Sequence, residues 1–261
     1  MTTRMLLTAL LAAGMLLATG SASHADLIGY WPLDESSGTN APNLGSGAGG
    51  PTNGTLVNME DADWVAGQFG NALAFDGNDE YVDAGDIPAI GTTDDFTWSL
   101  WTYNEDVVNN DVILGNRDDG GANVGWTKFT TSKFEYRSNQ NADIDYSDIP
   151  QNQWVHHAVV KSGATMTYYR NGVDSGLTST STAAATAQPF NLGGDAPFNE
   201  HWHGRLDDVA VWTDALPANT IAGLANGTIS PPGALIPEPS TLVLAILSLL
   251  GFAILRRRRR K

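Results

Sequence analysis

The sequence predicts an all-β fold, a two-sheet antiparallel sandwich of the jelly-roll type. Short runs rich in β-branched and aromatic residues recur along the chain, separated by clusters of Gly, Asn, Asp and Ser. Asn171-Gly172 follows the predicted strand 165–170 and matches a type I′ hairpin turn, whose two central residues need positive φ. Long helical patterns are scarce. Many short strands with close turn signals favour a sandwich or jelly roll.

Taken in order, the predicted elements are mostly strands. One short helix is expected at 217–225, with Pro217 in its first turn and Gly227 after its end. The Gly-rich segment 45–54 is predicted as a loop, and the Ser/Thr/Ala-rich segment 178–187 as a loop or weak strand. The predicted strands are 29–33, 72–75, 81–84, 96–103, 112–115, 126–130, 133–137, 154–161, 165–170, 190–192 and 206–212.

The N-terminal segment has the pattern of a signal peptide. Arg4 supplies a positive charge, 5–19 is apolar, and Ser23 and Ala25 are small residues at the −3 and −1 positions of a cleavage site. Cleavage would leave Asp26 as the new N-terminus. An uncleaved anchor or a buried helix is the alternative interpretation.

The C-terminal segment combines three features in a fixed order. Pro237, Glu238 and Pro239 precede Ser240 and the apolar run 241–255, and five Arg and one Lys follow at 256–261. A helix over this run would be about 22 Å long, which is short for a full membrane span, and the basic cluster favours a cytoplasmic end. The segment resembles the PEP-CTERM sorting signal, also called the ice-binding-protein C-terminal motif. That resemblance implies recognition by an exosortase at the bacterial inner membrane and delivery to the cell surface or matrix; a plain tail anchor is the alternative.

Without these two ends, the remaining chain is strongly acidic. Residues 26–239 keep 7 of the basic residues and all 29 acidic residues, a net charge of −22. Such a charge excludes nucleic acid as the expected partner, because binding phosphates needs Lys and Arg. It suits an extracellular protein that attracts cations. The chain has no cysteine, which excludes disulfides, thiol catalysis and thiolate metal sites.

Six short motifs occur in a fixed order along the chain. They are Tyr30-Trp31-Pro32-Leu33-Asp34-Glu35, Gly70-Asn71-Ala72-Leu73-Ala74-Phe75-Asp76-Gly77 with Tyr81-Val82, Phe96-Thr97-Trp98-Ser99-Leu100-Trp101, Trp154-Val155-His156, Tyr169-Arg170-Asn171-Gly172 and Gly204-Arg205-Leu206-Asp207-Asp208-Val209-Ala210-Val211-Trp212. Together they resemble the laminin G-like, concanavalin A-like jelly-roll domain of bacterial surface proteins. The resemblance runs from Tyr30 to about Ala225, and 106–152 departs most from the family pattern. It implies a domain of two antiparallel sheets whose loops contact a ligand.

The sequence gives no support for catalysis. Some relatives on this jelly roll are glycoside hydrolases whose carboxylates alternate along one strand, so that both flank the sugar bond. No Glu in this chain has an Asp two places later, and no Ser stands in a G-x-S-x-G turn. Adjacent acids such as Asp207 and Asp208 point to opposite faces of a regular strand. We therefore expect a protein that is not an enzyme, with a divergent glycosidase or lyase as the remote alternative.

A structural calcium ion is the expected cofactor. Calcium prefers several carboxylate and carbonyl oxygens, and the family resemblance implies an ion that ties the first strand to the last. The corresponding residues are Glu35 and Asp207. The acidic loop 76–80 is a second candidate, although it lacks the length of an EF-hand. A solvated acidic edge is the alternative interpretation of the pair.

Aromatic residues near loops are the candidate ligand-binding residues. An exposed ring covers the apolar face of a sugar, while Asn and Arg side chains bond its hydroxyls. Most of the tryptophans, Trp31, Trp98, Trp101, Trp154 and Trp212, lie in predicted strands and are expected in the core. The candidate ligand-binding residues are Asn116, Arg117, Trp126, Tyr136 and Trp202.

Together these patterns predict a non-catalytic surface-displayed binding module for glycans or other matrix components. The alternative is a structural or adhesive surface protein without a small ligand. The expected partners are an exosortase-type enzyme, a glycan or surface protein, and the inner membrane before processing, in a Gram-negative-type bacterium. The predicted segments are a signal peptide at 1–25, a laminin G-like domain at 26–229, a Pro-rich linker with the sorting motif at 230–239, a transmembrane sorting helix at 240–255 and a basic cytoplasmic tail at 256–261.

Overall fold

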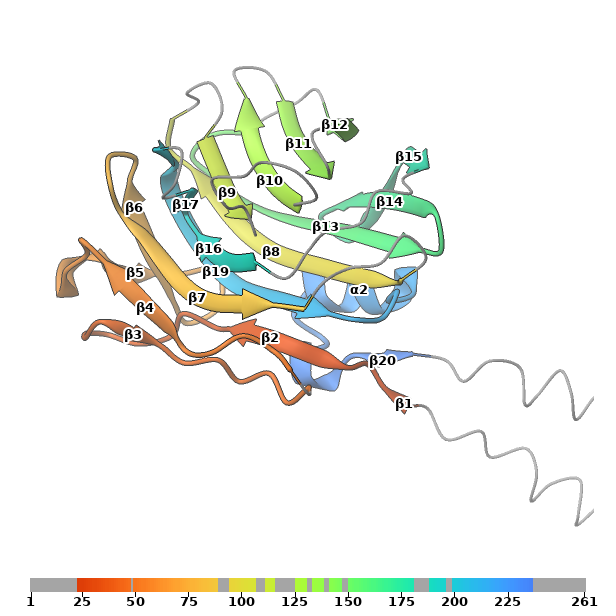
Figure 1. Cartoon of the computed structure of the whole chain (residues 1–261), viewed down its shortest axis with the longest axis horizontal. Helices are drawn as coiled ribbons and strands as arrows, with labels where there is room; N and C mark the ends of the chain where they lie inside the picture. Colours follow the sequence, from red (N-terminus) through yellow and green to blue (C-terminus); the bar gives the residue numbers. More distant parts are fainter. Residues whose placement is uncertain are drawn as a thin grey trace, which may run out of the picture. The chain divides into compact units, whose positions relative to one another are not determined.

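The computed structural model confirms an all-β sandwich of two antiparallel sheets (Figure 1). Its contacts divide the chain into two units, one of 1–24 with 235–261 and the other of 25–234. The residues that the structure describes are 23–47, 49–88, 94–106, 111–115, 125–130, 133–138, 141–146, 150–180, 188–195 and 199–236.

The first sheet, called the β7 sheet after one of its central strands, has eight strands. Burial alternates along β7, because one of its faces meets the core and the other meets solvent. In spatial order the strands are β12 (Asn141–Tyr146), β11 (Lys133–Ser138), β10 (Gly125–Thr130), β9 (Asp111–Gly115), β16 (Gln188–Leu192), β7 (Tyr81–Ile87), β4 (Gly54–Val57) and β3 (Asn40–Ala41).

The second sheet, called the β8 sheet, also has eight strands. The long strand β19 pairs along one side with β8; its other side pairs first with β6, over 203–206, and then with β2, over 209–212. The strands are β15 (Val173–Thr180), β14 (Thr165–Arg170), β13 (Trp154–Ser162), β8 (Phe96–Asn104), β19 (His203–Trp212), β6 (Asn71–Asp76) and β5 (Trp64–Ala66), with β2 (Leu27–Trp31) beside β19.

Short elements connect and flank the sheets. Asn171 and Gly172 have φ of 49° and 76° and join β14 to β15, which confirms the predicted type I′ hairpin. The predicted helix is also confirmed, beginning one residue later with Pro217 as its N-cap. These elements are η1 (Asp61–Asp63), β17 (Gly194–Asp195), β18 (Glu200–His201), α2 (Ala218–Ala225) and η2 (Pro231–Gly233); in the other unit, β1 (Ser23–His24) pairs with β20 (Leu235–Ile236).

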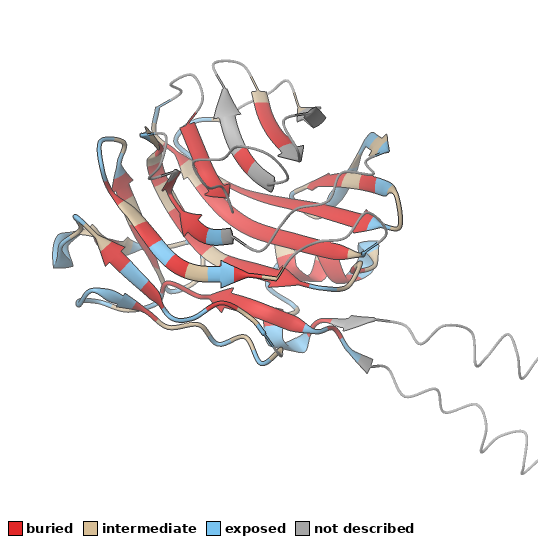
Figure 2. Ribbon diagram, in the orientation of Figure 1, coloured by how far each residue is buried: buried red, intermediate tan, exposed pale blue. Residues whose placement is uncertain are grey.

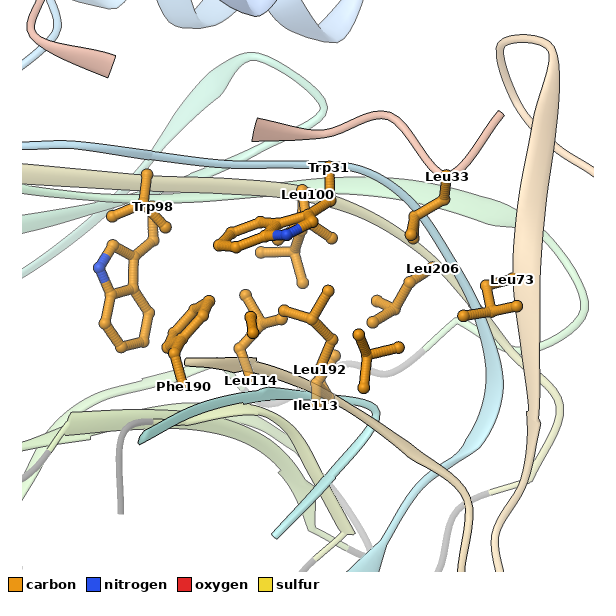
Figure 3. Close-up of a cluster of buried hydrophobic side chains, with 14 of the residues drawn as sticks. Trp31, Leu33, Leu73, Trp98, Leu100, Ile113, Leu114, Phe190, Leu192 and Leu206 are labelled. Atoms are coloured by element: carbon orange, nitrogen blue, oxygen red, sulfur yellow. The ribbon is translucent and has the colours of Figure 1, made fainter. Parts of the chain in front are cut away.

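The core lies between the two sheets (Figure 3). Trp31, Trp98 and Leu206 of the β8 sheet face Phe190 and Leu192 of the β7 sheet. Phe190 lies against both indoles, with ring centroids 5.7 Å from Trp31 and 5.4 Å from Trp98. This interdigitation of apolar side chains closes the sandwich.

The central strands of the β8 sheet are buried on both faces. Figure 2 shows β8 and β13 buried along almost their whole length, unlike β7. In β8, Trp98 and Leu100 belong to the core, so Ser99 and Trp101 project from the opposite, outer face. Because Ser99 and Trp101 are also buried, other parts of the chain must cover this outer face.

The predicted terminal segments fall largely outside the structure's description. Residues 1–22 of the signal peptide, the sorting motif Pro237, Glu238 and Pro239, and the sorting helix 240–255 all lie outside the described residues. Within the described ranges, no helix is long and apolar enough to cross a membrane.

Candidate functional site

A cavity of about 330 Å³ lies on the outer face of the β8 sheet. We call it the outer-face pocket. One side is formed by strands β2, β8, β13 and β19 and by the turn before β6, and the other by α2 and the segment that follows it. The residues used below are Tyr30, Asp34, Phe69, Ser99, Trp101, His156 and Asp208 on the first side, and Leu224, Ile229 and Pro231 on the second.

Strand register brings the polar and aromatic residues of this pocket together. His156 of β13 pairs with Trp101 of β8, and the two rings meet edge to face with centroids 5.3 Å apart. Phe69 also meets the Trp101 indole edge to face, at 5.7 Å. The Nε2 atom of His156 forms a 2.9 Å hydrogen bond with the Ser99 hydroxyl. The strands thus hold an indole, an imidazole and a hydroxyl in fixed positions.

The His156 imidazole has an unused hydrogen-bonding atom. Its residue is 1% exposed, and Nδ1 has no hydrogen-bond partner. Burial lowers the pKa of His156 to about 3, so the ring is neutral at physiological pH. A buried polar nitrogen without a partner costs roughly 1–3 kcal/mol of stability. A buried polar atom without a partner is an exception in native proteins, and an ordered water or a bound ligand is a usual explanation.

A β-bulge in β19 contains the adjacent acids Asp207 and Asp208, of which Asp208 lines the pocket. The register of β19 against β8 shifts between Asp207 and Ala210, at the point where β19 changes its other partner from β6 to β2. Asp208 has φ of 49°, a left-handed conformation that is uncommon for residues other than glycine. The expectation that these adjacent acids point to opposite faces assumed a regular strand, and the bulge removes that assumption.

The Asp208 carboxylate accepts a hydrogen bond from a tyrosine. The Tyr30 hydroxyl donates a 2.6 Å hydrogen bond to Asp208 Oδ1. Burial raises the pKa of Asp208, and the hydrogen bond from Tyr30 opposes that rise. The pKa of Tyr30 is raised in turn by burial, by this bond and by the charges of Asp208, Asp34 and Asp207. Tyr30 therefore stays protonated and orients Asp208 in the pocket.

Asp207 lies beside the pocket and is completely buried. Its Oδ2 accepts hydrogen bonds from the backbone amides of Gln68 and Phe69, at 2.7 and 2.9 Å, while Oδ1 has no partner. Burial raises the pKa of Asp207 to about 7, and the charges of Asp208 and Asp34 add to the rise. A buried carboxylate with an unpartnered oxygen is destabilising unless it takes up a proton or binds a water or a cation.

The predicted calcium ligands meet only part of calcium's requirements. Oε2 of Glu35 is buried without a hydrogen-bond partner, like Oδ1 of Asp207. Burial raises the pKa of Glu35, and Asp34 raises the pKa of both Glu35 and Asp207. Two carboxylate oxygens thus lack partners near Asp34. Among the described residues, however, no group of three or more His, Asp or Glu side chains is arranged to hold a metal ion.

The predicted ligand-binding aromatics do not form a surface site. Tyr136 and Trp202 are 2% and 0% exposed and belong to the core cluster. The Trp202 indole N–H donates to Asn104 Oδ1 at 3.0 Å. Both rings are enclosed by protein, so the prediction that they stack on a ligand is wrong. Asn116 and Arg117 lie outside the described residues, as does the side chain of Trp126, whose backbone belongs to β10.

Comparison with solved structures shows what this fold resembles. The fourth domain of an extracellular arabinanase of glycoside hydrolase family 43 from Geobacillus stearothermophilus, solved with arabinotriose, matches with a TM-score of 0.61 and 17% identity, covering 78% of this chain and 100% of that domain. Trypanosoma rangeli sialidase matches at 0.58 and 13%, covering 78% of this chain but only 33% of the sialidase. The binding domain of botulinum neurotoxin serotype G matches at 0.55 and 10%, covering 77% and 51%. At these identities the likeness shows the fold alone.

Sequence comparison gives the family. A search of curated proteins found no significant match. A laminin G family model, described as the concanavalin A-like lectin/glucanases superfamily, matches residues 76–222, which is more than half of the chain. This match confirms the laminin G-like part of the resemblance that the sequence motifs indicated. The chain therefore belongs to the concanavalin A-like lectin/glucanases superfamily.

Proposed function

We propose that this protein is a non-catalytic carbohydrate-binding module displayed outside the cell, and that the outer-face pocket is its binding site. The observation that carries the proposal is a cavity lined together by the Trp101 ring, the Asp208 carboxylate and the imidazole of His156, whose buried Nδ1 has no partner. Sugar sites typically combine an aromatic surface with a few fixed hydrogen-bonding groups. The family and the arabinotriose bound to the structurally similar arabinanase domain support a carbohydrate as the ligand.

Binding is favoured over hydrolysis. A glycosidase needs two carboxyl groups that flank the scissile bond, one of them free to donate a proton. In the outer-face pocket, Asp208 already accepts the Tyr30 hydroxyl at 2.6 Å, and the alternating carboxylate pattern of laminarinase-type enzymes is absent from the sequence. A divergent glycosidase remains the less favoured alternative.

The proposal includes export and surface sorting. The signal-peptide pattern over 1–25 and the Pro-Glu-Pro, apolar and basic pattern over 237–261 support it. An exosortase-type enzyme would recognise the C-terminal segment at the inner membrane. The excess of acidic residues and the lack of cysteine are compatible with an extracellular domain that uses no disulfide.

Glycan binding should depend on Trp101. We expect Trp101→Ala to weaken binding of the best glycan by at least about tenfold, or about 1.4 kcal/mol, because the substitution removes the large aromatic surface against which the sugar ring packs. Isothermal titration calorimetry with the purified full-length chain, after a glycan-array screen, measures this. Trp154→Ala is the matched control, since Trp154 lies outside the pocket against Tyr103. Equal losses in both variants would refute the site, and no glycan binding at all would favour a purely structural or adhesive role.

Calcium at Glu35 and Asp207 is a separate part of the proposal. An ion bound only by the folded state adds about 1.4 kcal/mol at a tenfold excess over its Kd, which raises Tm by about 3–5 °C for a domain of this size. Thermal melts in chelator, calcium, magnesium and sodium chloride of matched ionic strength measure the effect. We expect calcium to stabilise the wild type beyond the sodium control, and Asp207→Asn to abolish the gain. Equal responses of both proteins would place any calcium site elsewhere.

A further inference from the structure

The outer-face pocket is negatively charged and has no basic side chain to balance that charge. Asp34 and Asp208 line it, and Asp207 stands at the start of the bulge, next to Asp208 in the chain. Within the described part of the chain, the lining residues include no Lys or Arg. The imidazole of His156 is neutral, because burial lowers its pKa to about 3. An anionic ligand would therefore meet repulsion here without any compensating cation.

The carboxylates of this region are hydrogen-bond acceptors that also complement a positive charge. Asp34 and Asp208 line the pocket, and Oδ1 of the fully buried Asp207, next to Asp208 in the chain, has no partner. Tyr30 already donates its proton to Asp208, so its hydroxyl is not a free donor. Nδ1 of His156 donates or accepts according to the tautomer of the ring. The carboxylates therefore fit a ligand rich in N–H and O–H groups.

Aromatic rings form much of the remaining wall. Tyr30, Phe69 and Trp101 all line the pocket, and Trp101 is held edge to face by Phe69 and His156. Aromatic faces attract ammonium groups as well as the apolar faces of sugar rings, with Trp the most effective. Carboxylates combined with aromatic rings are suited to an organic cation of limited size, and a cavity of about 330 Å³ admits a sugar residue.

We propose that the outer-face pocket selects a sugar residue that carries a protonated amino group, and that it excludes acidic sugars. This inference rests on the proposed carbohydrate-binding function and specifies its ligand class. The ammonium group lies at the Asp34 and Asp208 edge of the pocket, and the sugar ring lies against Trp101. A hydroxyl group on the same residue forms a hydrogen bond with His156 Nδ1, as donor or acceptor according to the tautomer.

The test compares three oligosaccharide series of matched length with the full-length protein at about 0.15 M salt, where long-range attraction is screened. The series are glucosamine oligomers, N-acetylglucosamine oligomers and galacturonate oligomers. We expect glucosamine oligomers to bind at least tenfold more tightly than the acetylated series, and galacturonate oligomers not to bind. Each titration is repeated in calcium and in chelator, because a calcium ion at the neighbouring Glu35 and Asp207 would reduce the local negative charge.

Two variants separate a specific site from general attraction to an acidic protein. Asp208→Asn removes the charge but keeps an oxygen for the Tyr30 hydroxyl, and Asn tolerates the left-handed backbone at this position. We expect it to reduce the preference for the amine to about threefold or less. Asp86→Asn, at an exposed position of β7 on the other sheet, makes the same charge change and should leave the preference intact.

The outcomes distinguish this inference from the proposed function. If neutral glycans bind through Trp101 but an amino group does not increase the affinity, the proposed preference for amino sugars is wrong and the proposed binding site is retained. If Asp86→Asn lowers glucosamine binding as much as Asp208→Asn does, the attraction is non-specific and the inference fails. If none of the three series binds, the inference fails, and the proposed function fails as well only if the glycan array also finds no ligand.

Discussion

Replacing Trp98 with alanine is expected to reduce the free energy of unfolding by about 3–5 kcal/mol, the usual loss for a buried Trp or Phe truncation. Trp98 has no exposed surface and lies at the centre of the core. It meets Phe190 and Tyr136 edge to face, with centroids 5.4 and 5.6 Å away. The truncation would leave a cavity between the two sheets that neighbouring strands cannot close without losing their register.

Chemical denaturation followed by fluorescence and circular dichroism measures this loss. Leu44→Ala is a suitable control, because the Leu44 side chain is 54% exposed and should change stability by less than about 0.5 kcal/mol. If Trp98→Ala were as stable as Leu44→Ala, Trp98 would not be part of a packed core and the sandwich would need revision.

The stability of the protein should fall as pH rises from about 5 to 8, in part because of Glu80. This side chain is 8% exposed, and burial raises its pKa from 4.5 to about 7, with the charges of Asp63, Asp76 and Asp79 adding to the rise. The hydrogen bond from the Asp76 amide, at 2.6 Å, opposes it. Because the pKa is higher in the folded state, the folded state retains a proton that the unfolded chain has released. The contribution to stability is therefore complete below about pH 4.5 and lost as pH approaches 7.

Glu80→Gln isolates this effect. Gln keeps an acceptor for the Asp76 amide but carries no charge, so we expect the variant to gain about 2 kcal/mol over the wild type at pH 8 and almost nothing at pH 5. Urea denaturation at the two pH values measures the difference. Asp86→Asn, which removes an exposed charge, controls for the lower net charge. A pH-independent gain in Glu80→Gln would contradict the account.

The regular strands and the hairpin could be predicted from the sequence because their signals are local. The predicted strand 96–103 corresponds to β8, and the Asn171-Gly172 turn requires only two residues that tolerate positive φ. The strand that follows this turn, β15, was only partly foreseen. It is a Ser- and Thr-rich edge strand that is largely exposed, so it lacks the apolar alternation that marks a strand. Strands of two to four residues, such as β4 and β5, are too short to show a period at all.

The position of Trp202 could not be predicted from its neighbours. The residue stands between two histidines and beside a loop, which suggested exposure. Its burial depends on contacts far away in the chain, since its backbone amide donates to the Gly193 carbonyl and its indole donates to Asn104. Such contacts depend on the tertiary arrangement of β16, β18 and β8, which no short segment encodes.

The candidate site was missed for a related reason. The sequence of β8 does contain a signal that both of its faces are buried, because Ser99 and the large residue Trp101 alternate with the core residues Trp98 and Leu100. A strand with large residues on both faces must be covered on both, but the sequence does not show that α2 supplies part of that cover. The residues Asp207 and Asp208 also give no sequence signal of a bulge. The bulge lies where the pairing partner of β19 changes from β6 to β2.

A crystal structure of the protein with its tightest-binding oligosaccharide is the most direct test of the central claim, that the outer-face pocket binds carbohydrate. We predict a sugar ring lying against Trp101 between the β8 sheet and the segment that follows α2, with a hydroxyl within hydrogen-bonding distance of His156 Nδ1 and an amino group beside Asp208. A sugar bound instead on the outer face of the β7 sheet, with the outer-face pocket containing only water, would contradict the account.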